Sequence, residues 1–227
     1  MMAGIIAETA GPDDIAELFN VSRESFEKLQ VYAHLLEKWQ KRINLVGPQE
    51  VSRIWSRHIA DALQLVGYMP KEMKCAVDLG TGPGIPGVII AAVLGSQGFH
   101  VHLVESNGKK AAFLREAVRE MKISADVHCA RIESLYEEQW VDGVDVVFAR
   151  ALAPLPKLMD LAAPFVKKSK KMLLLKGLDV DSELTETTKC WNVDYQKHPS
   201  RTYAGGCILN IKDFHRVSVS SQSKEPR

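Results

Sequence analysis

The sequence predicts an α/β fold: a doubly wound, mostly parallel sheet with an N-terminal helical extension. After Pro70, short apolar runs alternate with stretches of helical periodicity, which is typical of a parallel sheet covered by helices on both faces. Before Pro70 the periodicity is helical only. We therefore expect a helical segment at residues 1–70, a sheet domain at residues 71–217 and a disordered polar tail at residues 218–227.

The N-terminal segment is expected to contain three helices. Pro12 favours the start of a short first helix, because proline suits the first helical turn. After Ser22, apolar residues recur at steps of three and four: Phe26, Leu29, Ala33, Leu36 and Trp39. Residues 44–47 break this helix. Pro48 should begin another, whose inner face carries Val51, Ile54, Trp55, Ala62 and Leu65.

Strands and helices are expected to alternate in the sheet domain, and right-handed crossovers make such a sheet doubly wound. The expected strands are Cys75–Gly80, His100–Glu105, Ala125–Ala130, Val144–Arg150 and Met172–Lys176. The expected helices are Gly87–Leu94, Gly108–Met121, Pro154–Val166 and Asp179–Trp191. A last strand at Cys207–Lys212, following Tyr195–His198, predicts a terminal antiparallel hairpin.

Composition places the chain among ordinary globular proteins, with 46% hydrophobic residues, 25% charged residues and a net charge of +1. No signal peptide is recognisable, and the longest apolar stretch, around residues 88–94, is too short to span a membrane. We expect a cytoplasmic monomer. The four cysteines form no CxxC pair, so we expect small buried hydrophobes and no metal site.

The strongest functional motif follows the first expected strand. Gly80, Gly82 and Gly84 allow a tight turn and remove Cβ atoms where a ligand would touch the backbone. In a doubly wound sheet, ligands bind at this end of the first strand. Gly82, Gly84 and Gly87 also satisfy the GxGxxG pattern of dinucleotide sites. The glycines alone therefore leave NAD and S-adenosylmethionine as alternatives.

Asp78 favours S-adenosylmethionine. A dinucleotide would place its pyrophosphate over the loop, where this carboxylate would repel it. S-adenosylmethionine carries a sulfonium and an ammonium instead, and both favour a nearby carboxylate. Pro83 and Pro86 also remove two amide donors that a phosphate would need.

Two further positions fit an adenosine site. Glu105 ends the second expected strand, where an acid can accept hydrogen bonds from both ribose hydroxyls. Ile132 and Glu133 follow the third expected strand at the same rim. We expect them to hold the face and the amino edge of adenine.

Several motifs occur together between about residues 35 and 180: Trp39–Leu45, Arg57–Asp61, Asp78–Gly87, Glu105–Ser106, Arg131–Glu133, Arg150–Ala151 and Lys176–Gly177. In this combination the sequence resembles the bacterial small-subunit (16S) ribosomal RNA guanine-N7 methyltransferases, the glucose-inhibited division protein B family. The resemblance implies a class I, Rossmann-like S-adenosylmethionine methyltransferase. It implies cofactor contacts from Gly80, Ile85, Ile132, Glu133 and Arg150, with Glu105 nearby.

The sequence departs from the family pattern at three places. Gln40 and Val46 replace the usual asparagine and threonine of the N-terminal motif, and Gly205–Cys207 stands where an arginine commonly precedes the last strand. These departures affect local contacts rather than the class of reaction.

The segment after the fourth expected strand bears on which atom is methylated. Residues 148–154 lack the Asn/Asp-Pro-Pro-Tyr/Phe motif of amino-group methyltransferases. No cysteine follows a proline, as cytosine C5 methylation typically requires. The remaining target atoms include guanine N7 and ribose oxygen, and N7 needs no general base because its lone pair is free at neutral pH.

Basic residues supply the expected contacts to 16S rRNA or the small ribosomal subunit. The candidates are Arg57, His58, Arg150 and Lys176, with a cluster of lysines at residues 167–171. His58 also lies on the apolar side of its helix, where a plain core histidine is an alternative. A small-molecule enzyme, either a small-substrate methyltransferase or an NAD-dependent dehydrogenase, is the alternative function.

Overall fold

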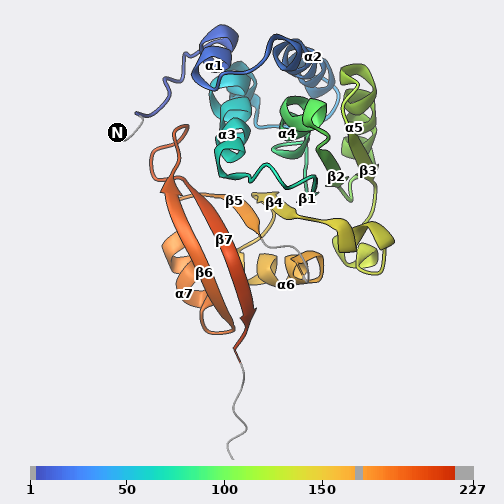
Figure 1. The fold of residues 1–227 in the computed structure, drawn as a ribbon. Coiled ribbons are helices and arrows are strands. Elements are labelled where there is room, and N and C mark those ends of the chain that lie inside the picture. Colours follow the sequence, from blue (N-terminus) through green and yellow to red (C-terminus); the bar gives the residue numbers. More distant parts are fainter. Residues whose placement is uncertain (1–3, 167–170, 218–227) are drawn as a thin grey trace, which may run out of the picture.

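The computed structural model describes residues 4–166 and 171–217 and shows a seven-stranded sheet between two layers of helices (Figure 1). The strand order is β3-β2-β1-β4-β5-β7-β6, and among the described strands only β7 runs in the opposite direction to the others. The strands are β1 (Cys75–Leu79), β2 (His100–Val104), β3 (Ala125–His128), β4 (Val146–Arg150), β5 (Met172–Lys176), β6 (Trp191–Pro199) and β7 (Cys207–Arg216). The predicted doubly wound fold is confirmed.

Two hydrophobic cores lie on opposite faces of the sheet. The N-terminal helices share the first core with α4 and α5, and the second core contains α6 and α7 (Figure 1). The α-helices are α1 (Pro12–Leu18), α2 (Arg23–Gln40), α3 (Ala60–Leu63), α4 (Gly87–Leu94), α5 (Gly108–Met121), α6 (Leu155–Val166) and α7 (Val180–Thr187). Among the described residues, no helix is both long and apolar enough to cross a bilayer.

The region from Pro48 to Tyr68 is the main departure from the expected helices. Instead of one regular helix it forms a 3₁₀ helix (Pro48–Arg53), a π-helical turn (Ile54–Ile59), the short α3 and a second 3₁₀ segment (Gln64–Tyr68). Ile54, Ala62 and Leu65 are buried as expected, whereas Val51 and Trp55 are only partly buried. The apolar spacing identified the buried face but not the hydrogen-bond pattern.

Two smaller expectations were also wrong. The last helix ends at Thr187, and Trp191 begins β6, where its buried ring packs against Phe214 of β7. The cysteines are not uniformly buried, because Cys129 and Cys190 are exposed. The expected disordered tail, residues 218–227, lies outside the described residues.

The parallel register brings the carboxyl ends of β1, β2 and β4 to one edge of the sheet. β1 pairs with β2 on one side and with β4 on the other, so the strand order reverses between β1 and β4. Open α/β sheets bind ligands at this switch point. The glycine-rich loop between β1 and α4 lies at this edge of the sheet.

Helix α2 contacts this loop directly. The Tyr32 hydroxyl, fully buried, donates a 2.8 Å hydrogen bond to the carbonyl of Pro83. At the end of α2, the Gln40 side-chain oxygen accepts from the amides of Leu45 and Val46 at 2.9 and 3.1 Å. Gln40, one of the departures from the family pattern, therefore holds the turn that follows its helix.

We expect Tyr32→Phe to lower the free energy of unfolding by about 0.5–1.5 kcal/mol, because it removes one buried hydrogen bond. The substitution should also weaken cofactor binding, since the loop loses its contact with α2. Chemical denaturation and calorimetric titration would measure the two effects. Tyr195→Phe, on the exposed hairpin, is the matched control and should change neither; equal behaviour of both variants would contradict this role for Tyr32.

Candidate cofactor and substrate site

The glycine loop needs its glycines for conformation. Gly80, Gly82 and Gly84 have φ angles of 63°, 59° and 93°, in the left-handed region that side chains disfavour. A β-carbon on Gly84 would also overlap Val88, and one on Gly80 would overlap the Leu152 side chain. The loop therefore packs tightly against both α4 and the segment after β4.

Asp78 lies beneath this loop rather than in a cavity. Its side chain is fully buried, and Oδ2 accepts 2.6 Å and 2.8 Å hydrogen bonds from the Thr81 hydroxyl and the Gly87 amide. Burial raises the pKa of Asp78 to about 7, although both hydrogen bonds lower it. The carboxylate therefore organises the loop. It was expected to face the cofactor charges, and the structure gives it no exposed surface to do so.

Glu105 joins the loop to β2. One carboxylate oxygen accepts from the Gly82 amide at 3.0 Å and the other from the Asn107 amide at 2.7 Å. A carboxylate has about four acceptor positions, so these bonds leave capacity for two hydroxyl donors. Only 8% of Glu105 is exposed, and it lines a cavity.

That cavity, of about 310 Å³, brings together residues expected to hold adenosine. Gly80, Glu105, Ile132 and Glu133 lie in its wall together with Leu152. The first four follow the ends of β1, β2 and β3. The cavity combines two carboxylates with an apolar surface, which fits a ribose and a flat base.

A second cavity, of about 260 Å³, shares the wall residue Gly80 with the first. Its wall includes Gly82, Ile85 and Arg150, all expected at the cofactor, together with His58. Gly80 and Ala151 line both cavities. An extended ligand can therefore pass over Gly80 from one cavity to the other.

His58 is an unusual wall residue. It is only 6% exposed, and neither ring nitrogen has a hydrogen-bond partner among the described residues. Its Nε2 lies 3.4 Å from Glu50 Oε2. Burial, with Arg150, Arg57 and Arg53 nearby, lowers the pKa of His58 to about 3, so the ring is neutral at pH 7. Unpartnered buried nitrogens in this wall fit a polar ligand.

A third cavity, of about 540 Å³, collects three of the four expected RNA contacts. Arg57, Arg150 and Lys176 line it, whereas His58 does not. Tyr203, whose ring centroid lies 4.7 Å from the Arg57 guanidinium carbon, forms part of the wall. Arg150 and Ala151 are shared with the second cavity, so the two spaces meet at the end of β4.

Asp61 is the functional-site residue that the sequence analysis undervalued. It is 4% exposed and lies 3.4 Å from Arg150 and 3.8 Å from Arg57, which precedes it by four residues. It also accepts a 2.6 Å hydrogen bond from the Thr202 hydroxyl. The spacing of four residues between Arg57 and Asp61 was the one sequence feature that could have indicated this role. The contact between Asp61 and Arg150 could not be predicted from the sequence, because the two residues are far apart along the chain.

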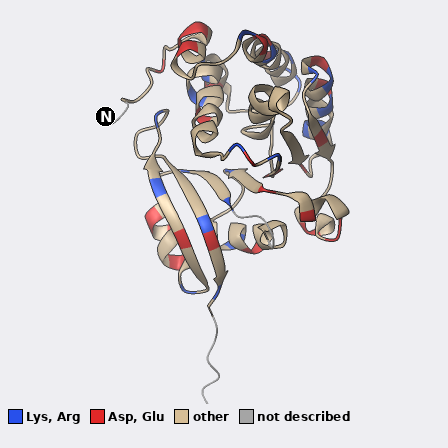
Figure 2. Ribbon diagram, in the orientation of Figure 1, with Lys and Arg blue, Asp and Glu red and all other residues tan. Residues whose placement is uncertain are grey.

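The lysines near β5 are less free than expected. Lys176 Nζ lies 2.6 Å from Glu183 Oε2, and its side chain is only 9% exposed. Lys171 donates to the carbonyl of Tyr68. The rest of the lysine cluster, residues 167–170, lies outside the described residues. In the view of Figure 2, basic and acidic residues are interspersed over the helices and the hairpin.

Ala151 has a strained backbone at the junction of the cavities. Its φ is 51°, and a left-handed conformation costs a non-glycine residue about 1–2 kcal/mol. Ala151 lines all three cavities. Strain at such a point is typical of a position fixed by function.

The fold and these joined cavities define a class I S-adenosylmethionine-dependent methyltransferase. A family model described as rRNA small subunit methyltransferase G matches residues 25–207. The chain belongs to this family.

Relatives named ribosomal RNA small subunit methyltransferase G are similar over most of the chain. The protein of Bradyrhizobium sp. (strain ORS 278) is 48% identical over 199 residues, 87% of this chain and 89% of the relative. The protein of Paramagnetospirillum magneticum is 43% identical, over 91% of this chain and 97% of the relative. These matches decide the cofactor in favour of S-adenosylmethionine over NAD.

Solved structures agree on the fold alone. The METTL16 methyltransferase domain has a TM-score of 0.54 at 13% identity, over 89% of this chain and 92% of its own. A mutant of MtNAS in complex with S-adenosylmethionine also has a TM-score of 0.54, at 14% identity, over 91% and 85%.

We expect Glu105→Ala to weaken S-adenosylmethionine binding by about tenfold to a hundredfold, since charge-assisted hydrogen bonds contribute about 1.5–3 kcal/mol. Isothermal titration would measure it, with NAD as a ligand that should give no binding heat. Glu120→Ala on the exposed face of α5 is the control. Parent-like affinity of Glu105→Ala would show that the carboxylate does not hold the cofactor.

Asp78→Asn should change how stability depends on pH. The pKa of Asp78 is about 7 in the folded protein and about 4 in an unfolded chain. Between these values the folded state binds more protons, so ionisation of Asp78 destabilises the parent as pH rises from 4 to 7. Asparagine removes this effect, and its side-chain oxygen can still accept from Thr81.

The stability of Asp78→Asn relative to the parent should therefore rise across that window by about 1.4 kcal/mol per unit of pKa difference. Urea denaturation at several pH values would measure the difference. Asp213→Asn, on exposed β7, is the control and should change the free energy of unfolding by no more than about 0.5 kcal/mol. A pH-independent difference for Asp78→Asn would contradict the raised pKa.

Proposed function

We propose that this protein transfers the methyl group of S-adenosylmethionine to N7 of a guanine in 16S ribosomal RNA, acting in the cytoplasm as a monomer. The observation that carries the proposal is the junction at Arg150 and Ala151. There, the cavity lined by cofactor residues meets a larger one lined by Arg57 and Lys176. The names of the relatives support ribosomal RNA of the small subunit as substrate.

We assign the two ends of the cofactor to the two smaller cavities. The adenosine would lie in the 310 Å³ cavity, with Glu105 accepting from the ribose and with Ile132 and Glu133 at the base. The methionine end would lie beside Gly82, Ile85 and Arg150 in the 260 Å³ cavity. The bound cofactor supplies an electrophilic methyl group on its sulfonium.

Guanine N7 fits a site whose residues orient rather than exchange protons. Its lone pair can attack a methyl group directly, so holding it in line is enough for catalysis. At the junction, His58 is neutral at pH 7 because its pKa is lowered to about 3, and Arg150 is held by Asp61. These residues shape and polarise the opening where the guanine would enter.

The larger cavity supplies the RNA contacts. The Arg57 guanidinium donates to Thr202 at 3.2 Å and lies over the Tyr203 ring, so it is held in place before RNA arrives. Tyr203 offers an aromatic face for a base, and Arg57 and Lys176 offer charge for phosphate. Preorganised groups of both kinds favour a nucleic-acid substrate over a small molecule.

Arg57→Ala should lower methyl transfer to small ribosomal subunits by about tenfold or more, while cofactor affinity stays near that of the parent, because Arg57 lines only the substrate cavity. Raising the salt concentration should lower RNA affinity and leave cofactor affinity almost unchanged. Methyl transfer and cofactor titration on the same variant would measure both.

The matched control is Lys189→Ala, whose exposed side chain pairs with Glu186 on α7. It should behave like the parent in both assays. Equal loss of methyl transfer and cofactor binding in Arg57→Ala would instead indicate a structural role for the Arg57–Asp61 pair. Nucleoside mass spectrometry of the product tests the N7 assignment, and a methylated ribose would overturn it.

A further inference from the structure

Three histidines and an aspartate lie together on neighbouring strands at the β3 edge of the sheet. His100 and His102 lie on one face of β2, because side chains two residues apart share a face. Asp126, which pairs with His102, and His128 lie on the same face of β3. None of these four residues lines the three cavities described above.

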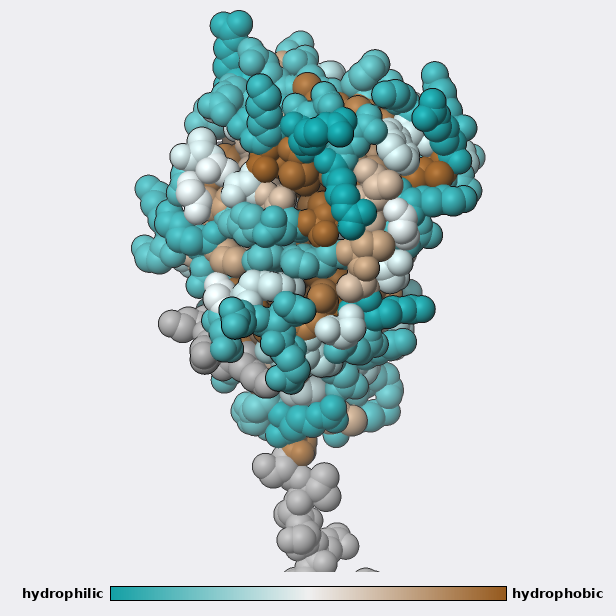
Figure 3. Space-filling view, turned by 90° about the vertical axis from the view of Figure 1, so that its right-hand side faces the viewer, coloured by the Kyte–Doolittle hydropathy of each residue, from teal (hydrophilic) through white to brown (hydrophobic). Residues whose placement is uncertain are grey.

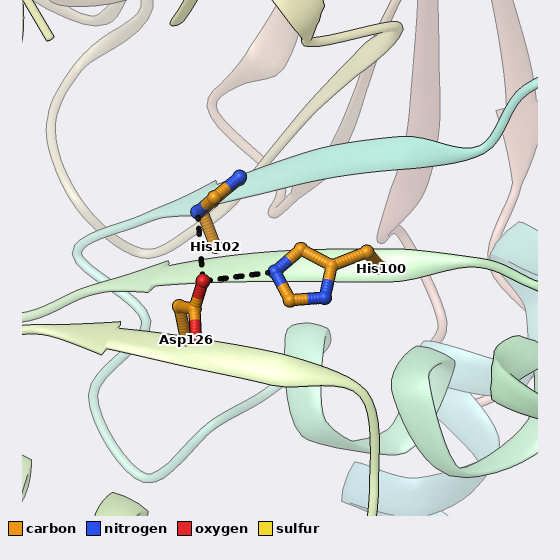
Figure 4. Close-up of side chains that lie close together, drawn as sticks. All are labelled: His100, His102 and Asp126. Atoms are coloured by element: carbon orange, nitrogen blue, oxygen red, sulfur yellow. Dashed lines mark hydrogen bonds and ion pairs between the residues drawn. The ribbon is translucent and has the colours of Figure 1, made fainter. Parts of the chain in front are cut away.

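Their polar atoms converge on a small space. Asp126 Oδ2 lies 3.2 Å from His100 Nε2 and 4.0 Å from His102 Nδ1, and Figure 4 shows both rings directed at this carboxylate. His128 Nε2 lies 3.0 Å from His102 Nδ1. In tetrahedral zinc sites, metal–ligand bonds of about 2.0–2.2 Å leave neighbouring ligand atoms roughly 3.3–3.6 Å apart. The two distances from Asp126 Oδ2, 3.2 and 4.0 Å, lie on either side of this range, so the ligand atoms must shift by a few tenths of an ångström to bind an ion.

Surrounding contacts fix the rings in this orientation. The other nitrogen of His100, Nδ1, lies 2.9 Å from the Ser124 hydroxyl, which leaves Nε2 facing Asp126. The Trp140 ring stacks on His102 and His128, with centroids 4.0 and 4.6 Å apart. Outer contacts of this kind orient histidines that bind metals.

We propose that His100, His102 and Asp126, whose ligand atoms all lie within 4.8 Å of one another, bind one zinc-class divalent cation. Imidazole nitrogen and carboxylate oxygen are ligands that Zn²⁺ prefers, and Ni²⁺ or Cu²⁺ would compete for the same set. No metal site was expected from the sequence, because the cysteines form no CxxC pair and the contact between His100, His102 and Asp126 depends on the pairing of β2 with β3.

The site is open to solvent and adjoins the cofactor region along the chain. The Asp126 side chain is 64% exposed. The side of the molecule that carries β3 mixes hydrophilic residues with hydrophobic ones (Figure 3). His102 precedes Glu105 by three residues, and His128 precedes Arg131 by three. A bound ion would link β2 to β3 a few residues before the segments of each strand that line the proposed adenosine cavity.

A hydrogen-bonded cluster without metal is the competing explanation, and zinc titration separates the two. The full chain, stripped of metal with a chelator, should bind one equivalent of Zn²⁺ in competition with a chromophoric zinc indicator. His100→Ala and Asp126→Asn should each weaken this binding by about tenfold or more. Both positions are partly or largely exposed, so the metal-free variants should melt like the metal-free parent.

Two control variants test the assignment. His34→Ala, exposed on α2, and Cys129→Ser, which removes the exposed thiol next to His128, should bind zinc like the parent. Co²⁺ in place of Zn²⁺ should give a tetrahedral spectrum without a thiolate charge-transfer band. The proposal is overturned if no equivalent binds, if the His100 and Asp126 variants bind normally, or if Cys129→Ser abolishes binding.

Discussion

The buried carboxylate of Asp78 is the constraint on which the site depends. It ties the end of β1 to the start of α4 by accepting from Thr81 and Gly87, and the chain between them must then turn through Gly80, Gly82 and Gly84. Burying an ionisable group is costly unless it is hydrogen-bonded. Here two short hydrogen bonds offset part of the cost of burial. The pKa of Asp78 is still raised, which shows that burial outweighs the two bonds.

The loop is also held from outside by parts of the chain that are distant in sequence. Tyr32 contacts the Pro83 carbonyl, Glu105 accepts from the Gly82 amide, and Leu152 packs over Gly80. Helix α2 shares a hydrophobic core with α4, α5 and β2, so the N-terminal helices pack against the elements that flank the glycine-rich loop. A substitution in α2 can therefore alter the conformation of the loop without a direct contact with the cofactor.

The sequence was sufficient wherever a feature depends on local periodicity or on backbone conformation. The alternation of strands and helices, the α5 boundaries and the need for glycine in the loop are of this kind. It failed where the outcome depends on contacts between distant segments. Three groups of contacts depend on the tertiary arrangement: Asp61 with Arg150, Lys176 with Glu183, and the cluster around Asp126. The irregular turns between Pro48 and Tyr68 were also missed, because their apolar pattern is one that a regular helix would satisfy equally well.

The substrate cavity is basic in composition but largely compensated in charge. Arg57 and Arg150 share Asp61, and Lys176 is paired with Glu183. A phosphate that enters must compete with these carboxylates, so each cation contributes less affinity than an unpaired surface lysine would. The pairs fix the direction of each cation, and under the proposed function they would orient the RNA rather than read its sequence. Orientation is what the proposed N7 methylation needs, because the reaction depends on bringing one lone pair into line with the methyl group.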